Sequence, residues 1–272
     1  MVLNLAAIRK QIDRLIVVDN GSREQDLEGL VQPSDECILN EENFGIARAL
    51  NQGIERANLL GAEWIFLFDQ DSCATEGMVD AMLEEFERSV WGERLGILVP
   101  RYRDRRLLSD IPPDRTRIGL HAAMTSGSLL RSRTFAEHGM FVDDLFIDAV
   151  DYEFSLRLRR AGLVLEQCDS AVLLHSPGDP EVHRFGGRKI FLTANYSPVR
   201  RYYQERNKVW VARRYFRDFP FFCTRLFFFG SKDLIKIILG EHNKRIKLRF
   251  FLRGTLDGLR ERMGRLDLSQ PD

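Results

Sequence analysis

The stretch Trp64–Ser72 most constrains what this chain can fold into, because five large apolar residues lead directly into Asp69-Gln70-Asp71. A short, unbroken apolar run with aromatic and β-branched residues is typical of a strand that is buried on both faces. Such strands occupy the centre of parallel sheets, whose ligands bind at the carboxyl ends of the strands. Two carboxylates at such an end can share a divalent cation that also holds a phosphate. The alternative role for the pair is a solvated turn.

The chain has 272 residues, enough for one large domain or two small ones. Its net charge is zero, but residues 201–272 hold 17 Lys and Arg against 8 Asp and Glu, while residues 1–200 hold 23 against 32. The basic C-terminal part predicts contact with a polyanion or a membrane surface, or else is a solvated helical surface. The 4 cysteines form no Cys-x-x-Cys pair, which favours a reducing cytosol and argues against structural zinc or a disulfide framework.

The first hundred residues alternate between predicted strands and helices, which favours an α/β fold with helices on the faces of a mostly parallel sheet. Apolar runs predict the strands, and apolar residues at helical spacing predict the helices. Thr75 is expected to cap the third helix. The predicted strands are 15–18, 37–39, 64–68 and 96–100, and the predicted helices are 3–12, 46–57 and 78–86.

The rest of the chain is less regular and ends in helices. We predict a charged loop over 101–119, a strand within 124–131, a helix over 154–161, one or two strands within 164–174, a polar loop over 180–196 and a long helix from 198 to about 215. An aromatic segment follows over 219–230, then a helix over 231–240 and basic helices with glycine interruptions. The predicted domains are a sheet domain, 1–197, and a helical basic C-terminal extension, 198–272.

Several carboxylates and one histidine stand where strands end or a helix begins. Asp19 ends a predicted strand, and its carboxylate either binds a nucleotide or turns the chain by accepting backbone N–H groups. Asp148, Asp151 and Glu153 precede a helix, where they either favour the helix N-terminus or include a general base. His175 follows a buried strand and is either structural or a metal ligand.

Five motifs, taken in this order, resemble family 2 glycosyltransferases of the GT-A fold. They are Asp19-Asn-Gly-Ser22, Asn43-Phe-Gly45 with Asn51-Gln-Gly53, Phe68-Asp-Gln-Asp-Ser72, Asp151-Tyr-Glu-Phe-Ser-Leu-Arg157 with Gly162, and His175. Four segments are similar to the bacterial rhamnosyltransferase subgroup within this family. They are the Asp-Gln-Asp-Ser form, Phe-Ile-Asp-x-Val-Asp-x-Glu, His-x-x-Gly-Asp, and Ser197-Pro-x-Arg-Arg-Tyr-Tyr with Arg206-Asn207. The resemblance covers roughly residues 5–260.

The resemblance implies roles for individual residues. Asp69 and Asp71 match the motif that binds the metal and the nucleotide diphosphate, and His175 matches a further metal or phosphate contact. Asp151 matches the catalytic base, with Glu153 and Arg157 as its structural neighbours. Asp19 matches the nucleotide-binding aspartate. Arg200, Arg201 or Arg206 could add positive charge to the leaving group, or could form the basic face of a surface helix.

The implied activity is inverting transfer of L-rhamnose from dTDP-L-rhamnose, with Mg²⁺ or Mn²⁺, to a lipid-linked or growing surface polysaccharide. No nucleic-acid partner is expected. One alternative is an inactive relative that binds a nucleotide sugar or a partner enzyme. A nucleotidyltransferase is disfavoured because the chain has no early glycine-rich loop followed by basic residues.

The chain departs from the family at its start and carries an unusual C-terminal part. Members open with a first strand that ends in a Thr-Tyr-Asn-like stretch, whereas Met1 here lies where the following helix would begin, so we expect a truncated sequence. The N-terminus lacks the features of a secretory signal, and no segment reaches about 20 apolar residues, so a cytoplasmic protein is expected. Residues 219–272 suit a helix at the inner surface of the plasma membrane, or packing against the catalytic domain or a second subunit of a homodimer.

Overall fold

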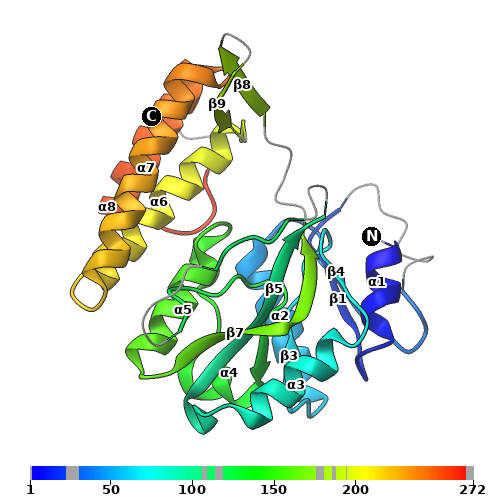
Figure 1. The fold of residues 1–272 in the computed structure, drawn as a ribbon. Helices are drawn as coiled ribbons and strands as arrows, with labels where there is room; N and C mark the ends of the chain where they lie inside the picture. Colours follow the sequence, from blue (N-terminus) through cyan, green and yellow to red (C-terminus); the bar gives the residue numbers. More distant parts are fainter. Residues whose placement is uncertain are drawn as a thin grey trace. The chain divides into compact units, whose positions relative to one another are not determined.

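The computed structural model describes residues 2–22, 31–105, 109–113, 119–175, 181–185, 188–193 and 195–267 (Figure 1). The chain forms two compact units. The first unit comprises Met1–Asp143 and Asp151–Ser176, and the second comprises Asp144–Val150 and Pro177–Asp272. The boundary therefore falls about twenty residues before the predicted one at 197, and a short segment from the middle of the chain joins the C-terminal helices.

The first unit is an α/β structure, as the sequence predicts. Its helices and strands are α1 (Val2–Arg9), β1 (Ile16–Asp19), β2 (Glu36–Leu39), α2 (Ile46–Leu59), β3 (Trp64–Phe66), β4 (Cys73–Ala74), α3 (Met78–Arg88), β5 (Leu95–Asp104), β6 (Leu129–Arg131), α4 (Ser132–His138), α5 (Val150–Arg160, from the last residue of the 144–150 segment) and β7 (Val164–His175). Short 3-10 turns lie at Gly92–Arg94 and Asp143–Leu145.

The main sheet is mixed rather than mostly parallel. Its order is β3-β6-β5-β7-β4, in which β5 and β7 are parallel while the other neighbours are antiparallel. The predicted central position of the Trp64 strand is wrong, because β3 ends this order and pairs with β6 alone among the described strands. β1 and β2 form a separate parallel pair. A buried apolar run specifies burial but not which strands will flank it.

The helices of the first unit bury the apolar faces that their spacing predicts. On α3, Met78, Val79, Met82 and Phe86 are all buried, and the Phe86 ring meets Trp64 edge to face at 4.7 Å. Thr75 does not cap this helix as predicted. Its hydroxyl donates instead to the carbonyl oxygen of Val172 at 2.7 Å, which ties the turn to β7.

The second unit begins with a hairpin where the sequence predicted a polar loop. β8 (Glu181–Phe185) pairs antiparallel with β9 (Arg188–Thr193), and Glu181 lies opposite Thr193. The prediction of a loop is wrong for 181–185 and 188–193, which pair as strands.

Three helices complete the second unit: α6 (Pro198–Tyr215), α7 (Pro220–Gly240) and α8 (Lys244–Leu259). α7 is one helix where two segments were predicted. Gly254 and Gly258 do not interrupt α8 as predicted. They let it approach α6, since a Cβ at Gly254 would collide with the carbonyl oxygen of Tyr202, and one at Gly258 with that of Arg206. Among the described helices, none is both long and apolar enough to cross a membrane.

Candidate active site

The turn that carries Asp69 and Asp71 is fixed by a second turn at residues 124–128. After β3 the chain continues in register, with the Leu67 amide donating to Ser128 and the Gly127 amide donating to Leu67. The hydroxyl of Ser126 accepts from the Asp69 amide at 3.1 Å and bonds the Ser72 hydroxyl at 2.7 Å. The small residues of this second turn therefore let the two turns come into contact.

His175 lies beside this acidic turn because β4 pairs with the end of β7. Cys73 is opposite Leu174, so the preceding Ser72 meets His175, with its hydroxyl 3.1 Å from Nδ1. The same nitrogen lies 3.8 Å from Oδ1 of Asp71. The His175 side chain is 16% exposed and that of Asp71 is 50% exposed, so the group opens to solvent on the Asp71 side.

The electrostatics of the turn favour a bound cation. Burial and the neighbouring charge of Asp71 raise the pKa of Asp69, while His175 opposes the shift. A divalent ion between the two carboxylates would offset their repulsion, and carboxylate oxygens with phosphate are the ligands that Mg²⁺ prefers. Within the described residues, no group of three His, Cys, Asp or Glu side chains could hold a metal ion. The residues therefore fit an ion that takes its remaining ligands from a bound diphosphate or from water.

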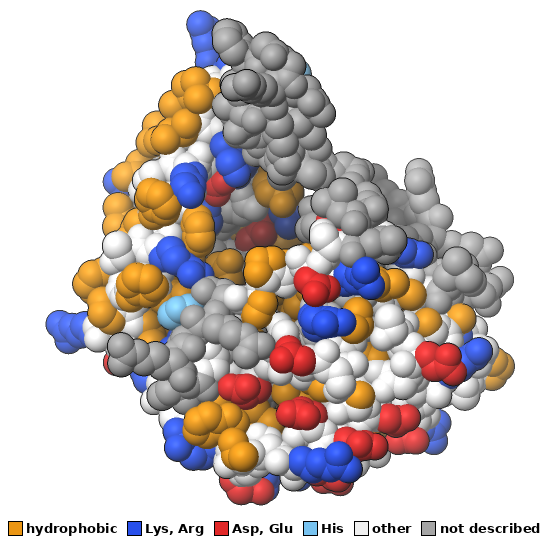
Figure 2. Space-filling model, in the orientation of Figure 1, with side chains coloured by type: hydrophobic (Ala, Val, Ile, Leu, Met, Phe, Trp, Pro, Cys, Tyr) orange, Lys and Arg blue, Asp and Glu red, His pale blue; other side chains and the backbone are white. Residues whose placement is uncertain are grey.

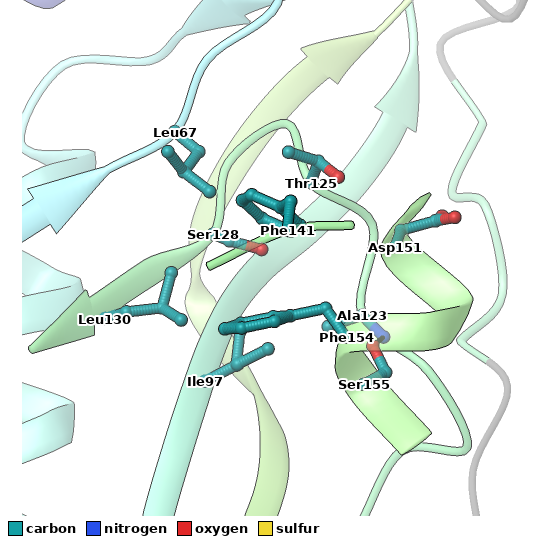
Figure 3. A pocket seen from close by; sticks show the side chains of 10 residues that line it. All are labelled: Leu67, Ile97, Ala123, Thr125, Ser128, Leu130, Phe141, Asp151, Phe154 and Ser155. Carbon is teal, nitrogen blue, oxygen red and sulfur yellow. Dashed lines mark hydrogen bonds between the residues drawn. The ribbon is translucent and has the colours of Figure 1, made fainter. Parts of the chain in front are cut away.

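Asp151 occupies the first turn of α5, at the rim of a small pocket (Figure 3). Ile97, Leu130 and Phe154 help to form its apolar floor, and the Asp151 carboxylate points away from them. The pocket has a volume of about 10 Å³, which suffices for about one water molecule. It cannot hold a nucleotide sugar. The residues that line it support the helix turn from which Asp151 projects.

Tyr102 is bonded to the turn that fixes Asp69. This buried side chain on β5 donates its hydroxyl to the carbonyl oxygen of Ser126 at 2.8 Å. Burial, then the charge of Asp151, then that of Asp69, raise the pKa of Tyr102 well above its ordinary value. The sequence does not single out Tyr102, because a largely buried strand gives no sign of which of its residues lies near a site.

The other two acidic residues of this cluster, Asp148 and Glu153, pair with arginines. Glu153 is 1% exposed and pairs with Arg157 through 2.7 and 3.1 Å bonds, in agreement with their implied structural role. Asp148 pairs with Arg200, whose Nε and Nη2 each lie 3.3 Å from a carboxylate oxygen. Of the cluster, Asp151 is the member that lines the pocket.

Asp19 ends β1 as predicted, and its Oδ2 accepts the Ser22 amide at 3.2 Å. This is the chain-turning role that the sequence left open beside nucleotide binding, and one carboxylate can do both. The next residue joins three motifs. Asn20 donates to Gly45 and Asn43, accepts from Phe44, and contacts Asn40. The repeated amides that follow β1 and β2 are the sequence signal for this network.

Arg201 and Arg206, predicted to contact the donor, are buried within the second unit. Arg201 is 3% exposed and donates to Glu241 and Gln204. Arg206 is fully buried, and its guanidinium donates to carbonyl oxygens at Asp144, Leu145 and Gly264. Because both side chains are buried and donate to groups inside the protein, we do not include either arginine in the donor site.

The sequence and the fold both have known relatives. Residues 2–140 match the family model described as Glycosyl transferase family 2. The chain is 29% identical over 235 residues to a dTDP-rhamnosyl transferase, RfbF, of Shigella flexneri, covering 80% of this chain and 76% of that protein. It is 28% identical over 223 residues to the galactofuranosyltransferase GlfT1 of Mycolicibacterium smegmatis, covering 72% of each.

A similar solved structure is that of GalNAc-T7 with UDP, GalNAc and Mn²⁺. It superimposes with a TM-score of 0.56 at 14% identity, covering 93% of this chain and 51% of that one. The chain thus spans about half the length of that protein, and at this identity the likeness concerns the fold.

Proposed function

The chain belongs to glycosyl transferase family 2, and from this membership we propose that it transfers L-rhamnose from dTDP-L-rhamnose, with inversion, to a hydroxyl of a lipid-linked or growing surface polysaccharide. The observation that carries the proposal is the acidic turn, where Oδ1 of Asp71 lies 3.8 Å from Nδ1 of His175 and the Ser126 hydroxyl accepts from the Asp69 amide at 3.1 Å. The similarity to a dTDP-rhamnosyl transferase supports the choice of donor.

The proposed reaction is a single displacement. Asp151 accepts the proton of the acceptor hydroxyl as its oxygen forms a bond to the anomeric carbon. The bond from that carbon to the diphosphate breaks on the opposite face, and the diphosphate leaves with the electron pair. Asp69 and Asp71, with His175 beside them, would hold Mg²⁺ or Mn²⁺. When bound, this ion supplies positive charge to the leaving diphosphate.

The remaining donor contacts are proposed at the end of β1. Asp19 is half-buried, and its second carboxylate oxygen can accept from a ribose hydroxyl or a base N–H while Oδ2 holds the Ser22 amide. The tight backbone there supports a fixed binding edge, because a Cβ at Gly21 would clash with the main chain of Glu42.

The proposal predicts metal-dependent turnover of dTDP-L-rhamnose. We expect release of dTDP when the protein is incubated with this donor, a lipid-linked saccharide acceptor, and Mg²⁺ or Mn²⁺. Excess EDTA should stop the release, and added metal should restore it, because the paired carboxylates alone would repel the diphosphate. The matched control is UDP-galactofuranose, which should turn over more slowly.

Faster turnover of the furanosyl donor would mean that the donor sugar is galactofuranose, the sugar named for the similar GlfT1. Tight dTDP binding without turnover of either donor would identify an inactive binding protein instead.

We also propose that the outer face of α7 and α8 lies on the cytoplasmic surface of an anionic membrane, where a lipid-linked acceptor would be found. Large apolar side chains on these helices are exposed, among them Phe221 at 70%, Phe228 at 57%, Leu239 at 62% and Leu252 at 59%. Basic residues such as Lys232, Arg245 and Arg249 are exposed between them. Figure 2 shows hydrophobic and basic side chains mixed over the visible face of the second unit.

The charge of this face supports an anionic partner. Residues 220–259 contain 8 Lys and Arg but only 3 Asp and Glu. Asp233 pairs with Lys208, Glu241 with Arg201 and Lys247, and Asp257 accepts the Tyr202 hydroxyl. All three carboxylates are thus turned inward, which leaves the outer face apolar and basic, the composition of helices that lie at anionic lipid surfaces.

Vesicle flotation tests this contact. We expect the protein to float with vesicles that contain phosphatidylglycerol but not with pure phosphatidylcholine, and high salt should weaken the binding. The Phe228→Ser/Leu239→Ser variant should no longer float, because it removes apolar side chains from the lipid-facing surface. Val90→Ser, which changes a residue of the first unit that is 92% exposed, is the matched control.

Absence of flotation by the unaltered protein would exclude the membrane contact. If sedimentation then shows a dimer that the double variant lacks, the face is a homodimer interface.

A further inference from the structure

The segment Asp144–Ala149, which leads into α5, has an unusual backbone. Phe146, Asp148 and Ala149 have φ values of 62°, 64° and 61°. This left-handed region is unfavourable for residues that carry a Cβ, and a bulky residue such as Phe adopts it only where neighbouring groups hold it there. Strain of this kind concentrates at functional sites, and this segment immediately precedes the helix turn that carries Asp151.

Asn207 on α6 binds three carbonyl groups of this segment. Its side-chain nitrogen lies 2.8 Å from the carbonyl oxygens of Leu145, Ile147 and Asp148. Its own Oδ1 accepts from Nε of Arg206 at 2.9 Å, and the side chain is completely buried. Because both the nitrogen and the oxygen of this buried amide are hydrogen-bonded, the side chain fixes the path of the segment's backbone.

Arg206 also donates hydrogen bonds to the backbone of this segment. Its Nη2 donates to the carbonyl oxygens of Asp144 at 2.9 Å and Leu145 at 3.2 Å, and its Nη1 donates to that of Gly264. The amide of Gly264 returns to the carbonyl oxygen of Asp144 at 2.9 Å. A buried guanidinium usually pairs with a carboxylate. Here it donates to backbone oxygens instead, so it stabilises the backbone conformation of the segment.

Two side chains of the segment are also held from α6. The Phe146 ring stacks on Tyr203, with centroids 4.9 Å apart and an interplanar angle of 16°. The Asp148 carboxylate accepts from Nε and Nη2 of Arg200. The motif Arg200-Arg-Tyr-Tyr203 with Arg206-Asn207, noted in the sequence for its positive charge, thus supplies most of the contacts that shape residues 144–149.

We propose that Asn207 and Arg206 are positioning residues for the carboxylate of Asp151. Only Val150 separates the segment from Asp151, so the backbone conformation that they hold determines where α5 starts and how its first turn is oriented. Released from these bonds, the left-handed residues would relax and turn the carboxylate away from an acceptor hydroxyl. This inference rests on the proposed function, in which Asp151 is the base.

Asn207→Ala tests the role of the amide. We expect a fall in kcat for dTDP-L-rhamnose of about tenfold or more, since a misplacement of about 1 Å can cost about 10²-fold. KM for the donor and the affinity for dTDP should not change, because the variant does not alter the acidic turn. The matched control is Lys208→Met, which removes the 2.9 Å bond to Asp233 from the adjacent position of α6 and leaves the segment's contacts intact.

A double variant separates positioning from general destabilisation. If Asn207 acts through Asp151, adding Asn207→Ala to Asp151→Asn should not lower the residual turnover further. A further fall in the double variant, an unchanged kcat in Asn207→Ala, or an equal fall in Lys208→Met would overturn the inference. Full activity of Asp151→Asn alone would instead refute the proposed function, so the two failures are distinguishable.

Discussion

Replacing Asp151 with asparagine should lower kcat for rhamnosyl transfer by about 10²–10⁴-fold, the range that a general base contributes. The amide keeps the size of the side chain but cannot accept the acceptor's proton. Binding of dTDP, measured by calorimetry, should not change, because the acidic turn with Asp69 and Asp71 remains intact. The matched control is Asp80→Asn, which changes an exposed aspartate in the first turn of α3.

The pairings around α5 explain why this effect should be specific to Asp151. Glu153 and Asp148 each hold an arginine, so their removal should act on stability and not directly on proton transfer. An Asp151→Asn variant that retains more than about a tenth of the activity, against the range given above, would contradict the assignment of the base.

Removing Glu241 should destabilise the second unit by about 3–5 kcal/mol, because it leaves buried cations without their partner. Its side chain is fully buried at the end of α7, with Arg201 on one oxygen and Lys247 at 2.9 Å on the other. Chemical denaturation of full-length Glu241→Ala should show this loss. Glu84→Ala removes an exposed pair with Arg88 at 3.5 Å and should cost less than about 1 kcal/mol.

Glu241→Gln provides a second measurement, since it keeps the hydrogen-bond acceptor but removes the charge. We expect an intermediate loss. Equal stability of Glu241→Ala and Glu84→Ala would mean that the buried network contributes no more than a surface ion pair.

The sequence predicted the class of fold and the residues at the ends of strands, because both depend on local patterns. Apolar runs located β1, β3 and β7, and the polar residues after them became the turn of Asp69 and Asp71 and the contact of His175. Strand directions were beyond local pattern. The run at Trp64 looks the same whether its neighbour is parallel or antiparallel, and its pairing with β6 depends on residues more than sixty positions away.

The arginines show a second limit of the sequence. Arg201 and Arg206 were predicted either to add positive charge to the leaving diphosphate or to form the basic face of a surface helix. Both are buried instead, and Arg206 lies where α6 packs closely against α8. That contact depends on Gly254 and Gly258, which were predicted to interrupt the helix. A glycine that permits close packing and one that ends a helix are indistinguishable until the partner helix is known.

The membership of residues 144–150 in the second unit has a consequence for synthesis on the ribosome. The groups that hold this segment come from Arg200 to Gly264, so they emerge long after Asp151 itself. A nascent chain can therefore form the acidic turn well before residues 144–150, which lead to Asp151, acquire their partners. Under the proposed function, a chain released before Arg200 could bind a nucleotide sugar but would lack a correctly presented base.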